Sequence, residues 1–140
     1  MSDLHVLIRL HQHELDEKRR ALADLYTDLA NLEQQQRALE RSFDLEKEAV
    51  AKANDVHFTF AQYAETVVKR REELARAETE LEGHIERAKA SLLETFGELK
   101  KFEMTQEERD RLEAEERAFR ESQDLDAIGL ETFRRKGDNA

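Results

Sequence analysis

The chain has 140 residues, of which 40% are charged and 6% are aromatic. This mixture is too polar for a thick globular core, so apolar side chains are expected to be buried along a thin seam. The net charge of −10 disfavours a nucleic-acid partner, because binding to a polyanion draws on the neutralisation of phosphates. The absence of cysteine excludes disulfides and thiolate sites and fits a reducing compartment.

The first predicted element is a helix over about residues 3–53. No proline occurs, and the first glycine is Gly83, so the backbone chemistry permits very long helices. Alternating steps of four and three residues from Leu4 give a mostly apolar series, which is typical of a coiled coil. The series is Leu4, Ile8, His11, Leu15, Lys18, Leu22, Leu25, Leu29, Leu32, Gln36, Leu39, Phe43, Glu46, Val50 and Ala53.

The apolar series breaks at residues 54–57, where Asn and Asp favour a turn, so we place a hairpin tip at residues 54–58. Thr59 and Gln62 have the spacing of a capping box, and Phe58 and Tyr63 that of a hydrophobic staple. A second helix is therefore predicted from Thr59 to about residue 124.

The second helix repeats the seam pattern and then loses it. Its mostly apolar series is Phe60, Ala64, Val67, Arg71, Leu74, Glu78, Leu81, Ile85, Ala88, Leu92, Thr95, Leu99 and Phe102. Beyond Phe102 charged residues dominate, so about twenty residues are expected to project without a partner and to become ordered on one. A last segment, residues 125–140, is apolar at near-helical spacing and ends in cations; it either docks or frays.

Two similar stripes joined by a short turn most simply pair within one chain. The predicted fold is all-α, a long antiparallel two-helix coiled-coil hairpin with a projecting C-terminal helical extension, in a single domain of residues 1–140. A parallel dimer and a disordered chain remain as alternatives.

No pattern of catalytic or metal-binding residues is evident. His5, His11 and His13 are six and two residues apart, spacings that do not converge on one helix face. The carboxylates are numerous, but a two-helix rod offers no cleft to perturb their pKa. We therefore expect a binding protein, with no enzymatic activity, no cofactor, no metal and no membrane span.

Several segments resemble the FliJ family of flagellar type III export proteins, in its alphaproteobacterial form. They are residues 4–11 (LHVLIRLH), 14–20 (ELDEKRR), 96–103 (FGELKKFE) and 125–136 (LDAIGLETFRRK). The resemblance implies a cytoplasmic stalk, associated peripherally with the inner face of the cell membrane at the export apparatus. Its implied partners are the export ATPase hexamer, the cytoplasmic domain of the membrane-embedded export gate, and the chaperones of export substrates.

The resemblance places the gate contact at Tyr63, Val67, Arg70 and Leu74, although Arg70 stands where a small residue is expected. An antiparallel hairpin brings a second set of residues to one end, where we expect the ATPase contact. This set is Leu4, Ile8, Lys18, Arg19, Arg20, Lys100, Lys101, Phe102, Arg109 and Arg111. The alternatives are a stalk or chaperone of a virulence-type secretion system, and a structural coiled-coil adaptor.

Overall fold

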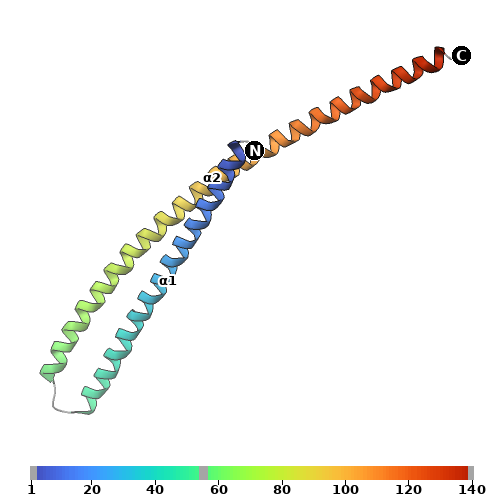
Figure 1. Cartoon of the computed structure of the whole chain (residues 1–140). Coiled ribbons are helices and arrows are strands. Elements are labelled where there is room, and N and C mark those ends of the chain that lie inside the picture. The colour runs from blue at the N-terminus through green and yellow to red at the C-terminus, as the bar shows by residue number, and fades with distance from the viewer. Residues whose placement is uncertain (1–2, 54–56, 139–140) are drawn as a thin grey trace. The chain divides into compact units, whose positions relative to one another are not determined.

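The protein is an all-α helical hairpin, as predicted. The computed structural model describes residues 3–53 and 57–138. Helix α1 spans Asp3–Lys52 and helix α2 spans His57–Asp138, and the two pack against each other (Figure 1). Both helices are continuous, because no proline interrupts them and none of the four glycines has a positive φ.

The chain divides into two compact units, where the sequence predicted one domain. The hairpin unit comprises His13–Phe96, and the terminal unit comprises Met1–Gln12 together with Gly97–Ala140. Both helices pass through both units. Each unit therefore contains a stretch of α1 packed against a stretch of α2.

The buried seam follows the predicted apolar series closely. On α1, each position of the series from Leu4 to Val50 except Glu46 is buried or half-buried, and on α2 the same holds from Phe60 to Phe102. The most deeply buried side chains include Val67 and Thr95, which are 1% and 2% exposed. The seam is thin because each helix contributes only one stripe, which explains why most other side chains face outward.

The polar contacts show that the helices of the hairpin unit are antiparallel. Lys18 contacts Thr95, Gln36 contacts Glu78, and Glu40 contacts Arg71, so the partners run backward along α2 as α1 runs forward. Near the end of α1, the Phe43 ring lies 6.0 Å from the ring of Phe60. This order is the one that a short connection between the helices requires.

Two predicted boundaries differ from the structure. Helix α2 begins at His57 rather than Thr59, and Phe58 is 78% exposed, so the predicted capping box and hydrophobic staple do not mark its start. Residues 125–138 do not form a separate segment but continue α2, because nothing before Gly137 compels a helix to end. The predicted turn at residues 54–56 lies outside the described residues.

Candidate functional site

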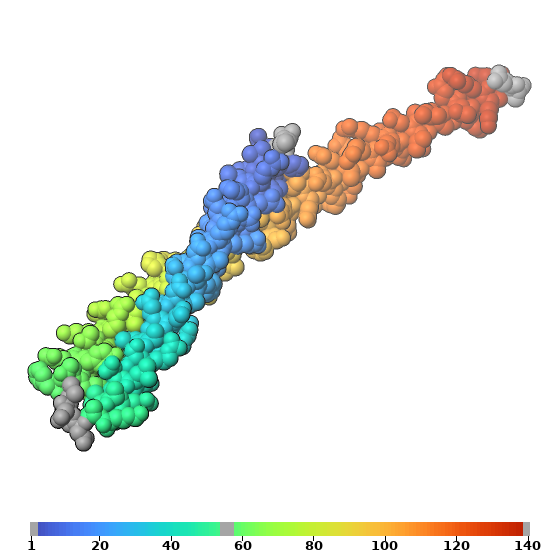
Figure 2. Space-filling model, turned by 60° about the horizontal axis from the view of Figure 1, so that its bottom comes forward, coloured from blue at the N-terminus to red at the C-terminus, as the bar shows by residue number. Residues whose placement is uncertain are grey.

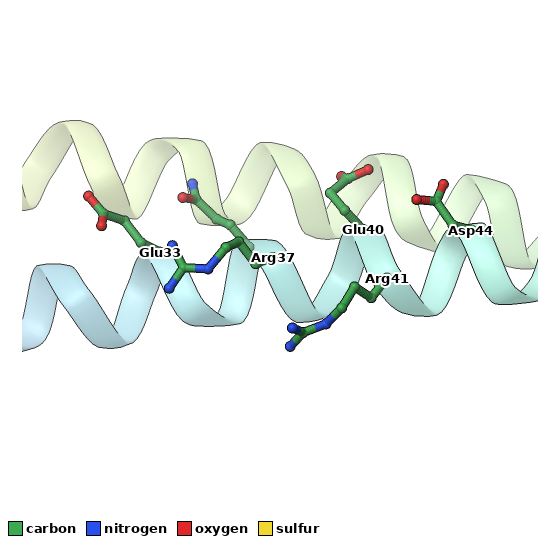
Figure 3. A pocket seen from close by; sticks show the side chains of 6 residues that line it. Glu33, Arg37, Glu40, Arg41 and Asp44 are labelled. Carbon is green, nitrogen blue, oxygen red and sulfur yellow. The ribbon is translucent and has the colours of Figure 1, made fainter.

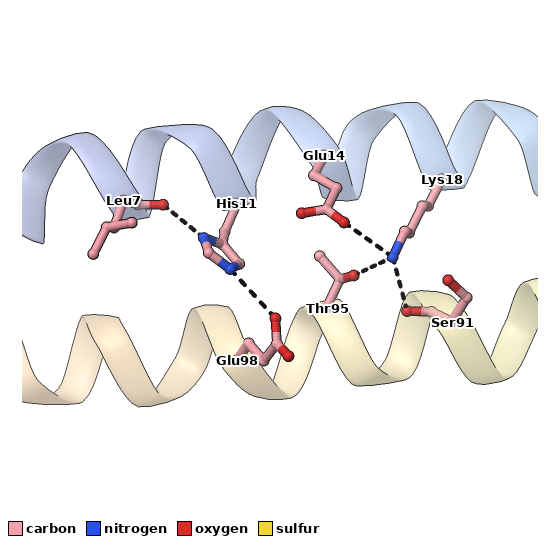
Figure 4. A network of polar contacts seen from close by, with 7 residues as sticks. All are labelled: Leu7, His11, Glu14, Lys18, Ser91, Thr95 and Glu98. Carbon is pink, nitrogen blue, oxygen red and sulfur yellow. Dashed lines mark hydrogen bonds and ion pairs between the residues drawn. The ribbon is translucent and has the colours of Figure 1, made fainter.

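A polar contact interrupts the apolar seam of the hairpin unit around Lys18 (Figure 4). The Lys18 ammonium donates hydrogen bonds to Thr95 Oγ1 at 2.5 Å and to the Ser91 carbonyl oxygen at 3.4 Å. It also pairs with the Glu14 carboxylate at 3.2 Å. All three groups satisfy the ammonium inside the seam, so the arrangement fixes the register of the helices and leaves no free cation there.

In the terminal unit, a second polar contact surrounds His11 (Figure 4). Its Nδ1 lies 2.8 Å from the Leu7 carbonyl oxygen, and its Nε2 lies 3.3 Å from the Glu98 carboxylate. The imidazole also packs against the Phe102 ring, with 4.9 Å between centroids. Both ring nitrogens therefore face oxygen acceptors, which identifies His11 as a seam residue with a structural role.

An aromatic and charged cluster lies toward the other end of the hairpin unit. Arg71 binds the Glu40 carboxylate through two nitrogens, at 2.5 Å and 2.7 Å, and its guanidinium lies 4.9 Å from the centroid of the Phe43 ring. The hydrogen bond from Arg71 lowers the pKa of Glu40 below its usual value, and the same bond raises the pKa of Arg71. The Phe43 ring also lies 6.3 Å from the Tyr63 ring.

The residues predicted to contact the export gate do not form one accessible surface. Val67 and Leu74 are 1% and 4% exposed because they occupy the seam against α1. Tyr63 is half-buried beside Phe43, and only Arg70 is exposed, with its guanidinium 3.0 Å from the Glu73 carboxylate. The gate contact therefore stays a prediction, and in the folded hairpin two of its four residues already pack against the partner helix.

The residues predicted to contact the ATPase fall into both units. In the terminal unit, Leu4, Ile8 and Phe102 belong to the seam and are buried or half-buried. They pack the helices together and offer little surface for contact with another protein. The cations of that unit are exposed: Lys100, Lys101, Arg109 and Arg111. In the hairpin unit, Arg19 and Arg20 are exposed, whereas Lys18 is held by the contacts in the seam.

The surface depressions lie along one helix or between the two helices. One is lined by Glu33, Gln36, Arg37, Glu40, Arg41 and Asp44, all on α1 (Figure 3). Among the residues that the structure describes, no three His, Asp or Glu side chains are placed to hold a metal ion. Within the same residues, no helix is long and apolar enough to span a membrane.

The longest run of exposed residues in the described part of the chain is the C-terminal arm, defined here as residues 107–138 of α2. Every residue of the arm is exposed, and Figure 2 draws this part of α2 in orange and red. Its apolar side chains share this exposure; Phe119 and Phe133, for example, are 63% and 78% accessible. An apolar surface of this kind on a helix is typical of a binding surface.

Sequence reasoning missed the residues that complete the polar contacts from the edge of the seam. These are Glu14, Glu40, Ser91 and Glu98. For the carboxylates that pair across the helices, the available signal is their position beside a seam residue, as for Glu98 before Leu99 and Glu40 after Leu39, where coiled coils place such charges.

Comparisons of the chain with protein-family models, curated proteins and solved structures found no match. The function is therefore inferred from the surfaces of the chain and from the sequence segments described above. Among those surfaces, the C-terminal arm stands out because it carries several large apolar side chains that are exposed.

Proposed function

We propose that this protein is a stalk of a type III export apparatus, similar to FliJ, which works by binding an export ATPase, an export gate and substrate chaperones. The observation that carries the proposal is a two-helix hairpin whose second helix continues into an arm without an intramolecular partner. A surface of this kind binds other proteins by presenting one helix face to a groove or to other helices. The four sequence segments that resemble FliJ support the export apparatus as the setting.

The terminal unit supplies the surface proposed for the ATPase. Its exposed cations Lys100, Lys101, Arg109 and Arg111 lie along α2, and Leu4 and Phe102 hold α1 beside this part of the helix. Lys100 is close to Glu103, and Arg111 is close to Glu108 and Glu115. Cations at the rim of an interface mainly raise the association rate and select the partner.

The export gate remains a proposed partner, but the surface proposed to contact it differs from the one predicted from the sequence. On the stretch of α2 that includes Val67, the accessible side chains include Val68 and Arg70, and Tyr63 is half-buried. Contact through these residues leaves the seam intact. Contact through Val67 and Leu74 requires the helices to separate, which exposes apolar surface at a cost of about 25 cal/mol per Å².

The direct test is binding of the full chain to the export ATPase of the same organism, measured by titration at low salt together with ATP turnover. We expect a complex and a change in turnover. Reversal of two exposed cations, K101E with R109E, should weaken binding about tenfold, equivalent to 1.4 kcal/mol.

The matched control is K69E, which reverses an exposed cation of the hairpin unit outside the proposed surface. It should leave binding unchanged. Absence of any complex at low salt contradicts the proposal, and equal weakening by K69E contradicts the choice of surface. Flagellar genes beside the coding sequence favour the flagellar system, and injectisome genes favour the virulence-type system.

A further inference from the structure

The C-terminal arm carries an apolar stripe at the spacing of a helix that packs lengthwise on another helix. Leu112, Phe119 and Phe133 are separated by seven or fourteen residues, and Ala118 and Leu125 by seven. Residues seven apart lie on nearly the same face of a helix. Phe119, Leu125 and Phe133 are each more than 60% exposed, so the stripe is uncovered.

Contacts within the arm stabilise its helix but do not cover the stripe. Arg111 pairs with Glu108 and with Glu115, and Arg120 pairs with Glu116, three or four residues apart in each case. Such pairs contribute only about 0.2–0.5 kcal/mol each, whereas helices in water gain most of their stability from packing an apolar face. These pairs therefore leave the apolar stripe of the arm without a helix packed against it.

The charges of the arm are distributed unevenly along its length. Residues 107–116 contain six acidic residues and two arginines, and the cations Arg134, Arg135 and Lys136 follow one another near the end of α2. A helix that is acidic near one end and basic near the other places opposite charges together with a copy of itself only when the two copies are antiparallel. In a parallel pair, acids face acids and cations face cations, which is destabilising.

We propose that the C-terminal arm pairs antiparallel with the same arm of a second copy of this chain. A two-fold axis at Ser122 sets Phe119 opposite Leu125 of the second copy, and each pair occurs twice. The same register sets Glu108 opposite Lys136 of the second copy, and it sets Leu112 and Phe133 opposite Thr132 and Arg111 of the second copy. This register therefore buries Phe119 and Leu125 at the centre of the pair and brings the acidic region of one arm beside the basic region of the other.

The first experiment measures the mass of the full chain by light scattering across a range of concentrations at physiological salt. We expect a dimer that dissociates on dilution. The double variant F119E/L125E should weaken the dimer about 100-fold, because it places charges where two apolar side chains are buried. The control L45E/F58E changes two apolar side chains of the hairpin unit that are also more than 60% exposed, and should remain dimeric.

The second experiment determines the direction of pairing by disulfide cross-linking, which is direct because the chain has no cysteine of its own. We expect S122C to form a covalent dimer by itself. E108C and K136C should cross-link efficiently only when the two variants are mixed. In a parallel pair, each of the three variants cross-links with itself, which would overturn the proposal.

The charge pattern has its own test. Reversing the basic region, with R134E, R135E and K136E, should weaken the dimer, and adding E107K, E108K and D110K to the same chain should restore it. A monomer at every concentration, or equal loss of the dimer in L45E/F58E, overturns the proposal. Because these experiments use the chain alone, their outcome is independent of whether an export ATPase binds.

Discussion

At the scale of single residues, the polar side chains in the seam lower the stability of the helix pair but fix the alignment of the two helices. Lys18 lies opposite Thr95, so a slip of α2 by one heptad would instead place the ammonium opposite Ala88 or Phe102, neither of which offers a side-chain acceptor. The slip loses the hydrogen bond to Thr95, and only Glu14, on the same helix as Lys18, still pairs with the ammonium. The contact therefore selects one alignment of the helices while adding little to its stability.

The substitution Lys18→Leu tests this view. We expect the free energy of unfolding to rise by about 1 kcal/mol, because Leu fills an apolar position beside Leu15 and needs no acceptor. The Thr95 hydroxyl can then turn to the carbonyl of Ser91, four residues earlier. Urea denaturation followed by circular dichroism measures the change, and Lys69→Leu, at an exposed position, should change it by less than about 0.5 kcal/mol.

Glu40 makes stability depend on pH. Its pKa is lowered in the folded state by the hydrogen bond from Arg71, so its contribution is present above the unfolded pKa and is lost as the pH falls through the lowered folded pKa. We therefore expect Glu40→Gln to lower the melting temperature at neutral pH and to have no effect in acid. Thermal unfolding at both pH values checks this, with Glu48→Gln as an exposed control on α1. An equal loss at both pH values would contradict the assignment.

At the scale of the helices, two adjacent valines offer a matched comparison. Val67 is 1% exposed in the seam, whereas Val68 is 49% exposed. We expect Val67→Ala to lower the free energy of unfolding by about 1–3 kcal/mol through lost burial and a cavity. Val68→Ala should leave it unchanged or raise it slightly, because Ala is the better helix former. Similar effects at both positions would show that Val67 is not buried in solution.

The helices could be predicted from the sequence to the extent that one simple rule governs them. Steps of four and three residues from Leu4 and Phe60 located the seam almost residue by residue, because burial along a helix pair depends on periodicity alone. The start of α2 was misplaced, since spacings such as Thr59 with Gln62 also occur inside helices. The accessibility of the predicted gate residues could not be predicted, because the sequence shows which residues are apolar but not that Val67 and Leu74 already pack against α1.

At the scale of the whole molecule, the C-terminal arm should differ from the rest of the chain in amide hydrogen exchange. Where light scattering gives a monomer, we expect residues 107–138 to exchange much faster than the seam around Leu74 and Ile85, since no tertiary contact protects them. Raising the protein concentration should slow exchange in the arm alone. Equal protection of arm and seam in the monomer would show that the arm has an intramolecular partner.

The thin seam of the hairpin unit also determines how a local defect spreads. Each layer of side chains touches only the layers just before and after it, because no common core connects distant parts of the two helices. A substitution that disturbs the packing of one layer therefore affects mainly the adjacent layers, and its effect decreases along the helices. The helices can separate over a few turns at one place while they remain closed elsewhere.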